Sequence, residues 1–500
     1  MSKNKKIDQQ KRKKKRIIIS IISAAVALCV IITAVSIGVV KYREESGFEL
    51  HNTVALQSKN YKISNAELSY FFKSAYDDFK SNHSQSLGAM GLDVNAKLKD
   101  QKCTYYDGYD TWYDYFLSEA QKRVEKNVSY AEAAKEMGME LSDDEKSKID
   151  SSISSMEQTA KNDDKTLDEY IAENYGKGVK SDDIRAAMEL SLLANKYYED
   201  YDSKTSYTDR QITDYYNKSP EKYNVVDLKK YEIPADTNDT DSTDEAEENA
   251  MSAKAAADKI ASAKNEAQFD SLLKAYLTDY YKNKGSEKTD KQLNSIISST
   301  LQTGFEYNKS AEVTKWAFDK SRKVGDTTVI EDGDNDCYIV YILIKTQYKQ
   351  NYLTKNVRHM LFTSDTYGSQ SDALTAAQDM IDEINHQSDK QAAFIERAKK
   401  YSEDAGSAKN GGLYENVKKG ETVDSFDEWC YYSGRKKGDM AVIFTTYGYH
   451  AMYFVGNGVP AWQVNVIDAM KTEQYANNLE TLKTTYDVKF NMNAAKKLDK

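Results

Sequence analysis

The chain has 500 residues, 40% of them hydrophobic and 11% aromatic, which excludes a wholly disordered protein. This length corresponds to roughly three domains of ordinary size. The formal net charge at pH 7 is −10. Because basic residues are concentrated at the N-terminus, the remainder is more acidic still, which argues against binding to nucleic acid.

A basic tail and a long apolar run open the chain. Residues 1–16 carry nine Lys or Arg residues and one Asp, and residues 17–40 carry no charge. The run is long enough to cross a hydrocarbon layer of about 30 Å, and the positive-inside rule keeps the tail cytoplasmic. We predict a single transmembrane helix over 17–40 and a cell-membrane protein whose bulk is extracytoplasmic. A cleaved signal peptide is the alternative, but no small-residue cleavage site ends the run.

Residues 50–216 have the pattern of a helical domain. Glycine is sparse there, and four capping boxes offer a side-chain oxygen to the free amides of a helix start. The boxes begin at Ser64, Ser142, Thr166 and Thr208. Aromatic residues gather at 70–72 and 106–116. We predict that these form the core of the helical domain, with a binding surface as the alternative.

An internal repeat follows. WAFDKSRKVGD at 316–326 matches WCYYSGRKKGD at 429–439 without a gap, and at the same offset of 113 residues Cys337 falls on His450. Upstream, VDLKKYEI and KNVRHMLF are short strand-like runs that each precede a helical pattern. We predict two copies of one α/β unit.

The order of elements is clear in the second copy. VRHMLF at 357–362 predicts a strand, helical patterns follow between 373 and 401, and a loop rich in glycine occupies 402–412. A short helix near 426–432 and two strands complete the copy. This order predicts a small open α/β domain.

The cysteines outside the apolar run do not indicate a metal site. They are Cys103, Cys337 and Cys430. Three cysteines so widely spaced form neither a disulfide framework nor a metal cluster. We expect buried thiols.

Four motifs of the second copy together resemble the parvulin (PpiC-type) peptidyl-prolyl isomerases. They are VRHMLF at 357–362, YSEDAGSAKNGG at 401–412, Ser425–Phe426 and FTTYGYH at 444–450. The anchor, the helical region, the tandem copies and a C-terminal helix further resemble the extracytoplasmic foldases of the PrsA and SurA type.

The predicted fold class is therefore α+β and multidomain, with a single N-terminal transmembrane helix, a helical chaperone-like domain, tandem parvulin-like α/β domains of which the first is degenerate, and a C-terminal helix. The predicted domain bounds are 1–16 for the basic tail, 17–40 for the span, 50–216 for the helical domain, 220–348 and 352–458 for the two copies, and 461–500 for the C-terminal helix.

The resemblance also implies the site residues. Catalytic roles are implied for His359, Asp404 and His450, and substrate-binding roles for Leu413, Thr422, Phe426, Thr445 and Tyr447. The chain has five histidines, and two of them occupy these places. Strand histidines without a chemical role are the alternative, which the surrounding motifs disfavour.

The implied reaction requires no nucleophile, metal or cofactor. Rotation about an X-Pro bond breaks amide resonance against a barrier of about 20 kcal/mol and takes roughly tens of seconds unaided. A site need only hold the proline in an apolar pocket and set fixed polar groups against the twisted amide. The two imidazoles are expected to orient and tune Asp404, which faces the rotating peptide.

The sequence departs from the family pattern in both copies. The second copy has GGLYE where the family usually has Gly-Gly-Asp-Leu-Gly, and Thr422 where Met is common. In the first copy Lys230 and Cys337 stand in the places of the two histidines, and the glycine-rich loop is missing. We predict that the first copy is catalytically silent.

These features predict an extracytoplasmic peptidyl-prolyl isomerase and folding chaperone for secreted or surface proteins. Its expected partners are unfolded or partly folded polypeptides with X-Pro bonds, and the membrane through the N-terminal helix. The alternative is a non-catalytic holdase or assembly scaffold in which both parvulin copies serve as binding modules.

Overall fold

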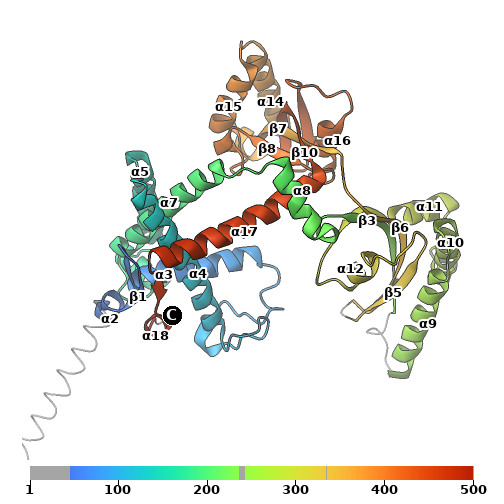
Figure 1. Cartoon of the computed structure of the whole chain (residues 1–500), viewed down its shortest axis with the longest axis horizontal. Helices are drawn as coiled ribbons and strands as arrows, with labels where there is room; N and C mark the ends of the chain where they lie inside the picture. The colour runs from blue at the N-terminus through green and yellow to red at the C-terminus, as the bar shows by residue number, and fades with distance from the viewer. Residues whose placement is uncertain (1–45, 236–242, 334, 499–500) are drawn as a thin grey trace, which may run out of the picture. The chain divides into compact units, whose positions relative to one another are not determined.

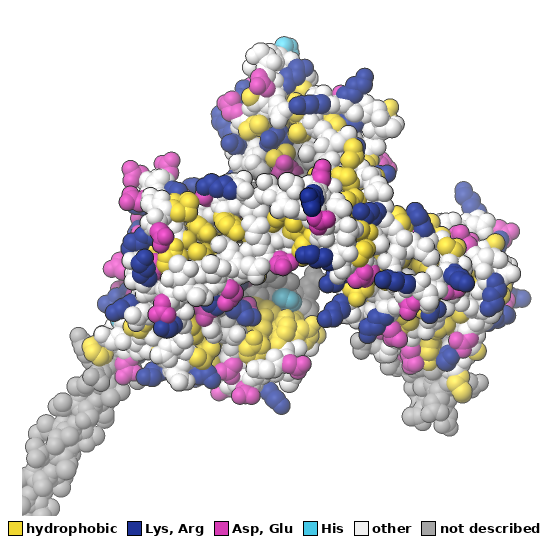
Figure 2. Space-filling model, in the orientation of Figure 1, with side chains coloured by type: hydrophobic (Ala, Val, Ile, Leu, Met, Phe, Trp, Pro, Cys, Tyr) yellow, Lys and Arg dark blue, Asp and Glu magenta, His cyan; other side chains and the backbone are white. Residues whose placement is uncertain are grey.

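The computed structural model describes residues 46–235, 243–333 and 335–498 (Figure 1). The chain divides into two compact units. The first combines Met1–Ser206 with Glu473–Lys500, and the second is Tyr207–Thr472. Figure 2 shows Lys and Arg side chains interspersed with Asp and Glu side chains over the face in view, so the net negative charge is not concentrated on one element of that face.

The predicted transmembrane helix requires a correction. Across the described residues, no helix combines the length and the apolar composition needed to cross a bilayer. The two longest, α4 (Trp112–Glu136) and α17 (Ala461–Thr485), carry charged side chains that a bilayer interior disfavours. Residues 17–40, where the span was predicted, lie outside the described residues. Over the described residues the fold class is therefore α+β and multidomain without a transmembrane helix, and the predicted single-pass membrane location is not retained.

The first unit is built mainly of helices. They are α2 (Phe48–Asn52), α3 (Asn65–Asn82), the 3-10 turn η1 (Leu98–Asp100), α4, α5 (Asp143–Asn162), α6 (Leu167–Tyr175), α7 (Ser181–Lys204), the end of α17, and α18 (Met492–Ala495). The capping boxes predicted at Ser64, Ser142 and Thr166 are confirmed here, and the one at Thr208 opens α8 (Asp209–Lys218) of the second unit. The side-chain oxygen of each capping residue bonds the amide three residues on, which is why the helices begin at these points.

The core of the first unit is aromatic, as predicted. Phe71, Phe72, Trp112 and Phe116 are each at most 2% exposed and lie in one cluster. Tyr105, in the loop before α4, is 57% exposed. The aromatic residues of both predicted stretches therefore form the core or pack against it, and the exposed Tyr105 lies just before the second stretch.

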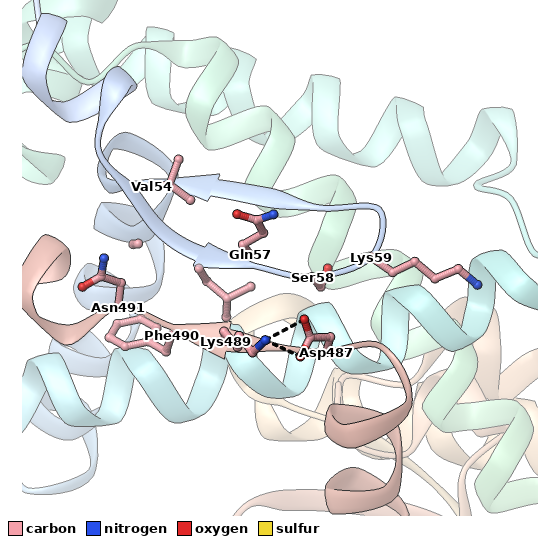
Figure 3. Close-up of a pocket in the computed structure, with 10 residues that line it drawn as sticks. Val54, Gln57, Ser58, Lys59, Asp487, Lys489, Phe490 and Asn491 are labelled. Atoms are coloured by element: carbon pink, nitrogen blue, oxygen red, sulfur yellow. Dashed lines mark hydrogen bonds and ion pairs between the residues drawn. The ribbon is translucent and has the colours of Figure 1, made fainter.

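The C-terminal segment completes the first unit. Its strand β11 (Lys489–Phe490) pairs with β1 (Val54–Gln57), which pairs with β2 (Lys62–Ser64) in an antiparallel sheet of order β11-β1-β2. Figure 3 shows the pocket that β1 and β11 line together. Beyond the strand, Ala495 and Leu498 are buried in the aromatic core. Residues more than 350 positions apart therefore share one core and one sheet.

The second unit contains two four-stranded antiparallel sheets of the same topology. The first comprises β3 (Val225–Pro234), β4 (Leu301–Glu306), β5 (Thr327–Asp332) and β6 (Cys337–Tyr348) in the order β4-β3-β6-β5. The second comprises β7 (Leu353–Phe362), β8 (Leu413–Val417), β9 (Met440–Thr445) and β10 (Gly448–Pro460) in the order β8-β7-β10-β9. The identical order confirms that the two segments are copies of one unit.

Helices cover each sheet. The first copy has α9 (Thr243–Ala261), α10 (Glu266–Asn283), α11 (Asp290–Ser299) and α12 (Glu312–Ala317). The second has α13 (Ser364–Tyr367), α14 (Gln370–Asn385), α15 (Lys390–Tyr401), the 3-10 turn η3 (Ala408–Asn410) and α16 (Asp424–Tyr431). The second unit also includes the turn η2 (Pro220–Lys222) after α8 and the start of α17.

The sheet of the second copy has two different faces. One apolar cluster, which includes Met360, Phe362 and Ala451, packs under α14 and α15. The other, which includes Val357 and Met452, packs under α16. Figure 1 shows α14 and α15 on one side of the sheet and α16 on the other. Because strand side chains alternate between faces, every strand residue is assigned to the α14 side or the α16 side.

The two copies differ in one turn, and this changes which residues are equivalent. The turn that joins β5 to β6 is two residues longer than the turn that joins β9 to β10. Before the turn, Gly325 corresponds to Gly438, as the ungapped match predicts. The amide of Gly325 donates to the Leu343 carbonyl, however, and the amide of Gly438 donates to the Phe454 carbonyl. The ungapped offset of 113 would match Leu343 with Gly456, but the hydrogen bonds match it with Phe454. After the turn, the equivalence is therefore shifted by two residues.

The shift corrects the residue predicted opposite His450. With the offset that the turn sets, Ile339 of β6 takes the place of His450 of β10. Cys337 takes the place of Gly448, at the start of the strand. An ungapped sequence match does not detect this, because the two additional residues lie in the turn and the strands on either side of it remain similar.

Candidate active site

The glycine loop, residues 402–412, is held against β7. The amide of His359 donates to the Gly412 carbonyl at 2.8 Å, and Arg358 Nη1 donates to the Asn410 and Gly411 carbonyls, each at 2.8 Å. Gly412 has φ +71°, and a Cβ there would lie 2.1 Å from the His359 carbonyl oxygen. Only glycine permits this approach of loop to strand. The loop thereby places Asp404 beside the α16 face of the sheet.

The three residues predicted as catalytic form one hydrogen-bonded chain with Thr445, which was predicted to bind substrate. His359 and His450 lie on the neighbouring strands β7 and β10, and their Nδ1 atoms are 3.1 Å apart. His359 Nε2 lies 3.0 Å from Asp404 Oδ2, and His450 Nε2 lies 2.8 Å from the Thr445 hydroxyl. The structure thus brings His359, Asp404, His450 and Thr445 together from three separate segments.

The chain of hydrogen bonds has one direction. An ionised carboxylate only accepts, so His359 Nε2–H donates to Asp404, and the Nδ1 of a neutral His359 is left as an acceptor. His450 Nδ1–H then donates to His359, and the Thr445 hydroxyl donates to His450 Nε2. Each imidazole is neutral and has both nitrogens satisfied.

Burial explains these charge states. It lowers the pKa of His359, although Asp404 opposes the shift, and it lowers the pKa of His450 to about 4, with the charge of His359 acting in the same direction. Burial by itself would raise the pKa of Asp404. The hydrogen bond from Ser407, the attraction to His359 when its imidazole is protonated, and hydrogen bonds from Gly406 and Tyr414 outweigh it and lower that pKa. Near neutral pH the site therefore holds one carboxylate and two neutral imidazoles.

Aromatic rings line the histidine pair. Phe426 of α16 is 3% exposed, and its ring centroid lies 5.5 Å from that of His359 and 5.8 Å from that of His450. Tyr414 of β8 lies 4.6 Å from His359 and 6.1 Å from Phe426, again between ring centroids. Phe426 therefore lies against both imidazoles, and Tyr414 lies against that of His359.

Leu413 does not join this wall. It pairs with Arg358, whereas Tyr414 pairs with Val357, a member of the α16-side cluster. Successive strand residues face opposite ways, so Leu413 lies on the α14 side of the sheet and Tyr414 on the α16 side. The side chain that faces the site is thus one position later than predicted, and a difference of one position inverts the face.

The other predicted substrate-binding residues have different surroundings. The Thr422 hydroxyl is buried and has no hydrogen-bond partner among the residues that the structure describes. The Tyr447 side chain is 68% exposed, and its backbone amide donates to Thr445 Oγ1 at 3.1 Å. Tyr447 is thus at the surface, next to the end of the hydrogen-bonded chain rather than within the aromatic wall.

Two residues of the site were not predicted. Ser407, 3% exposed, donates to Asp404 Oδ2 and has its Oγ 3.2 Å from His359 Nε2. The Tyr414 hydroxyl donates to Asp404 Oδ2 at 3.3 Å. Ser407 lies inside the quoted GSAKNGG motif, so its proximity to Asp404 in sequence was a usable signal. For Tyr414 the only signal was the GGLYE departure itself.

The first copy lacks this arrangement. Lys230 pairs with Tyr341 as His359 pairs with Met452, so Lys230 does take the place of His359. Ile339 takes the place of the second histidine and packs in an apolar cluster. An ammonium group and an aliphatic side chain cannot form the imidazole pair.

Comparison with protein families identifies the segment that holds the site. Residues 341–455 match the model of the PPIC-type PPIASE domain. We call this segment the PPIase domain, after the family that it matches. His359, Asp404 and His450 all fall within the PPIase domain. A search of curated proteins finds no match to the chain.

The chain is also similar to solved structures, but only at low sequence identity. The peptidylprolyl isomerase PrsA from Bacillus anthracis is 18% identical, over 28% of this chain and 64% of that chain, with a TM-score of 0.19. PrsA from Bacillus cereus is 19% identical, over 30% and 58%, with a TM-score of 0.19. A Campylobacter jejuni structure, described as one of the SurA-like chaperones PEB4 and Cj1289, is 20% identical, over 27% and 52%, with a TM-score of 0.18. The chain thus spans about half to two thirds of the length of these proteins.

We expect the PPIase domain to lose stability as the pH falls from 6.5 toward 4. In the unfolded chain an imidazole takes up its proton near pH 6.5, whereas His450 in the folded domain does so at about pH 4. Its stabilising contribution is complete above pH 6.5 and is lost on acidification, by roughly 3 kcal/mol. Thermal unfolding at about pH 7 and about pH 4.5 measures the loss, and His450→Gln should lose less. Equal losses in both proteins would contradict the assignment.

Proposed function

We propose that the chain is a peptidyl-prolyl cis-trans isomerase that acts as a folding chaperone on unfolded or partly folded polypeptides. The observation that carries this proposal is the convergence of Asp404, His359 and His450 against Phe426 within a segment that matches the PPIC-type domain. No pair of these residues is closer than twenty positions in the sequence, so the folded domain is required to assemble them.

The chemistry of prolyl rotation fits these surroundings. A planar amide is stabilised by resonance, and the twisted amide in the transition state has a different charge distribution. The half-buried ring of Tyr414 offers an apolar surface for the pyrrolidine ring, and the buried Phe426 packs against Tyr414. Asp404 stands at the end of a fixed polar chain, with its side chain 21% exposed and thus open to a bound peptide. Polar groups that are already oriented stabilise a transition state without reorganising during the reaction.

The proposal assigns the activity to the second copy alone. The first copy has Lys230 and Ile339 in the histidine places, and in it β4 follows α11 without the glycine loop. Its proposed role is to bind or space client chains. The holdase or scaffold alternative extends that non-catalytic role to both copies.

A double-mutant cycle on the whole chain tests the proposal. We expect Asp404→Ala to slow isomerisation of a proline tetrapeptide on the order of 100-fold. In a His359→Ala background the same change should cost much less, because residues that act as one unit are not additive. Lys230→Ala in the first copy is the matched control and should leave the rate unchanged.

Thermal unfolding of each variant excludes loss of fold as the cause. A folded wild-type chain without isomerase activity would favour the scaffold. Additive losses with unchanged unfolding temperatures would mean that His359 and Asp404 do not share a site, and the catalytic assignment of Asp404 would be withdrawn.

A further inference from the structure

Tyr414 lies between the aromatic and the ionisable residues of the site. It lies on β8, is half-buried, and pairs across the sheet with Val357. Its ring contacts His359 and Phe426, while its hydroxyl bonds Asp404 Oδ2. It therefore touches the His359 imidazole, the Phe426 ring and the Asp404 carboxylate at once.

The hydroxyl contact completes the set of donors around one oxygen. Asp404 Oδ2 accepts from His359, Ser407 and Tyr414, while Oδ1 accepts the Gly406 amide at 3.1 Å. The titratable groups that face Asp404 are His359 from β7 and Tyr414 from β8. Burial raises the pKa of Tyr414, and the charge of Asp404 raises it further, so the phenol stays a donor near neutral pH.

Local backbone geometry fixes the direction of Tyr414. Asn416, two residues on, has φ +54°, and the ladder between β7 and β8 shifts register between Lys355 and Val357. The Asn416 amide donates to Asn356 Oδ1 at 2.7 Å, and its side-chain Oδ1 accepts the Val459 amide at 3.0 Å. Asn tolerates the left-handed conformation better than most residues. This bulge follows Tyr414 directly and, with the pairing to Val357, keeps its side chain on the α16 side.

We propose, on the basis of the isomerase function above, that Tyr414 is a positioning residue of this site, whose hydroxyl fixes the Asp404 carboxylate and whose ring forms the wall expected from Leu413. The GGLYE variant of the motif is then a working alternative to the usual pattern. The loss of the loop Asp moves a tyrosine to the face where an aliphatic wall residue is usual, and the tyrosine adds a hydrogen-bond donor.

The test separates the hydroxyl from the ring. Tyr414→Phe removes only the hydroxyl and should lower kcat/KM about fivefold, while Tyr414→Ala should in addition raise KM for proline peptides. Tyr431→Phe is the matched control, because its hydroxyl donates to the Val417 carbonyl at 2.8 Å in the same domain and not to a residue of the hydrogen-bonded chain. The control should leave both kinetic constants unchanged.

A second readout does not depend on catalysis. The carboxyl carbon of Asp404, followed by NMR against pH in the whole chain, should titrate about one pH unit higher in Tyr414→Phe than in wild type, because one hydrogen bond to the charged form is lost. Tyr431→Phe should titrate as wild type does. An unchanged Asp404 titration in Tyr414→Phe, or an equal shift in both variants, would overturn the proposal.

The two readouts also separate this proposal from the proposed function. If the wild-type chain lacks isomerase activity but the titration of Asp404 shifts only in Tyr414→Phe, the isomerase function fails while the positioning of Asp404 by Tyr414 is supported. If the wild-type chain is active but neither rate nor titration responds to Tyr414→Phe, the function is supported and the role of Tyr414 is overturned.

Discussion

We expect Gly412→Ala to abolish isomerase activity and to destabilise the PPIase domain by several kcal/mol. A side chain at φ +71° costs on the order of 1–2 kcal/mol, and the new Cβ would lie 2.1 Å from the carbonyl oxygen of His359. That oxygen belongs to a central strand of the sheet, so it cannot move aside without disrupting β7. The loop must therefore separate from the strand, and Asp404 loses its place beside His359.

Gly420→Ala is the matched control for the backbone angle. Gly420 has φ +73°, almost the same as Gly412, but a Cβ there meets nothing within 4 Å. This change should cost only about 1 kcal/mol and leave the rate unchanged. Thermal unfolding and the isomerase assay measure both variants. Similar losses at the two glycines would show that the angle alone, and not the contact with His359, explains the requirement.

We expect removal of residues 486–500 to unfold the first unit while the PPIase domain stays folded and active. The deletion removes β11, and it takes Tyr486, Ala495 and Leu498, each at most 5% exposed, out of clusters formed with the helices. It also breaks the hydrogen bond from Asn65 to the Ala494 carbonyl at 2.9 Å. The combined loss is on the order of 5 kcal/mol or more, comparable to the whole stability of a typical domain.

Point variants test the packing of the C-terminal segment with a smaller change than the deletion. Leu498→Ala should destabilise the first unit by about 3 kcal/mol, because truncation of a buried leucine side chain leaves a cavity. Lys497→Ala, one position earlier and exposed, should change little. Limited proteolysis followed by mass spectrometry assigns the cleavage sites to one unit or the other. If the deletion leaves the first unit as resistant as wild type, the C-terminal segment is not part of its core.

The sequence was sufficient for those features that depend on neighbouring residues. Each capping box acts over four consecutive positions, so the helix starts at Ser64, Ser142, Thr166 and Thr208 were predictable. The repeat was also predictable, because both copies keep the same order of strands. The motifs of the second copy indicated His359, Asp404 and His450 as neighbours in space, and the structure places them in one hydrogen-bonded chain.

Only the tertiary structure decided which side chains face the site and which segments share a core. Strand side chains alternate with a period of two, so the pairing register of β7 and β8 places Tyr414, and not Leu413, in the wall. In the first copy, the longer β5–β6 turn moved Ile339, and not Cys337, to the place of His450. The segment 486–498 joins a core whose other members begin near residue 55, and no local pattern encodes a partner at that distance. These features depend on the pairing register of strands and on packing between distant segments, and both are set only when the chain folds.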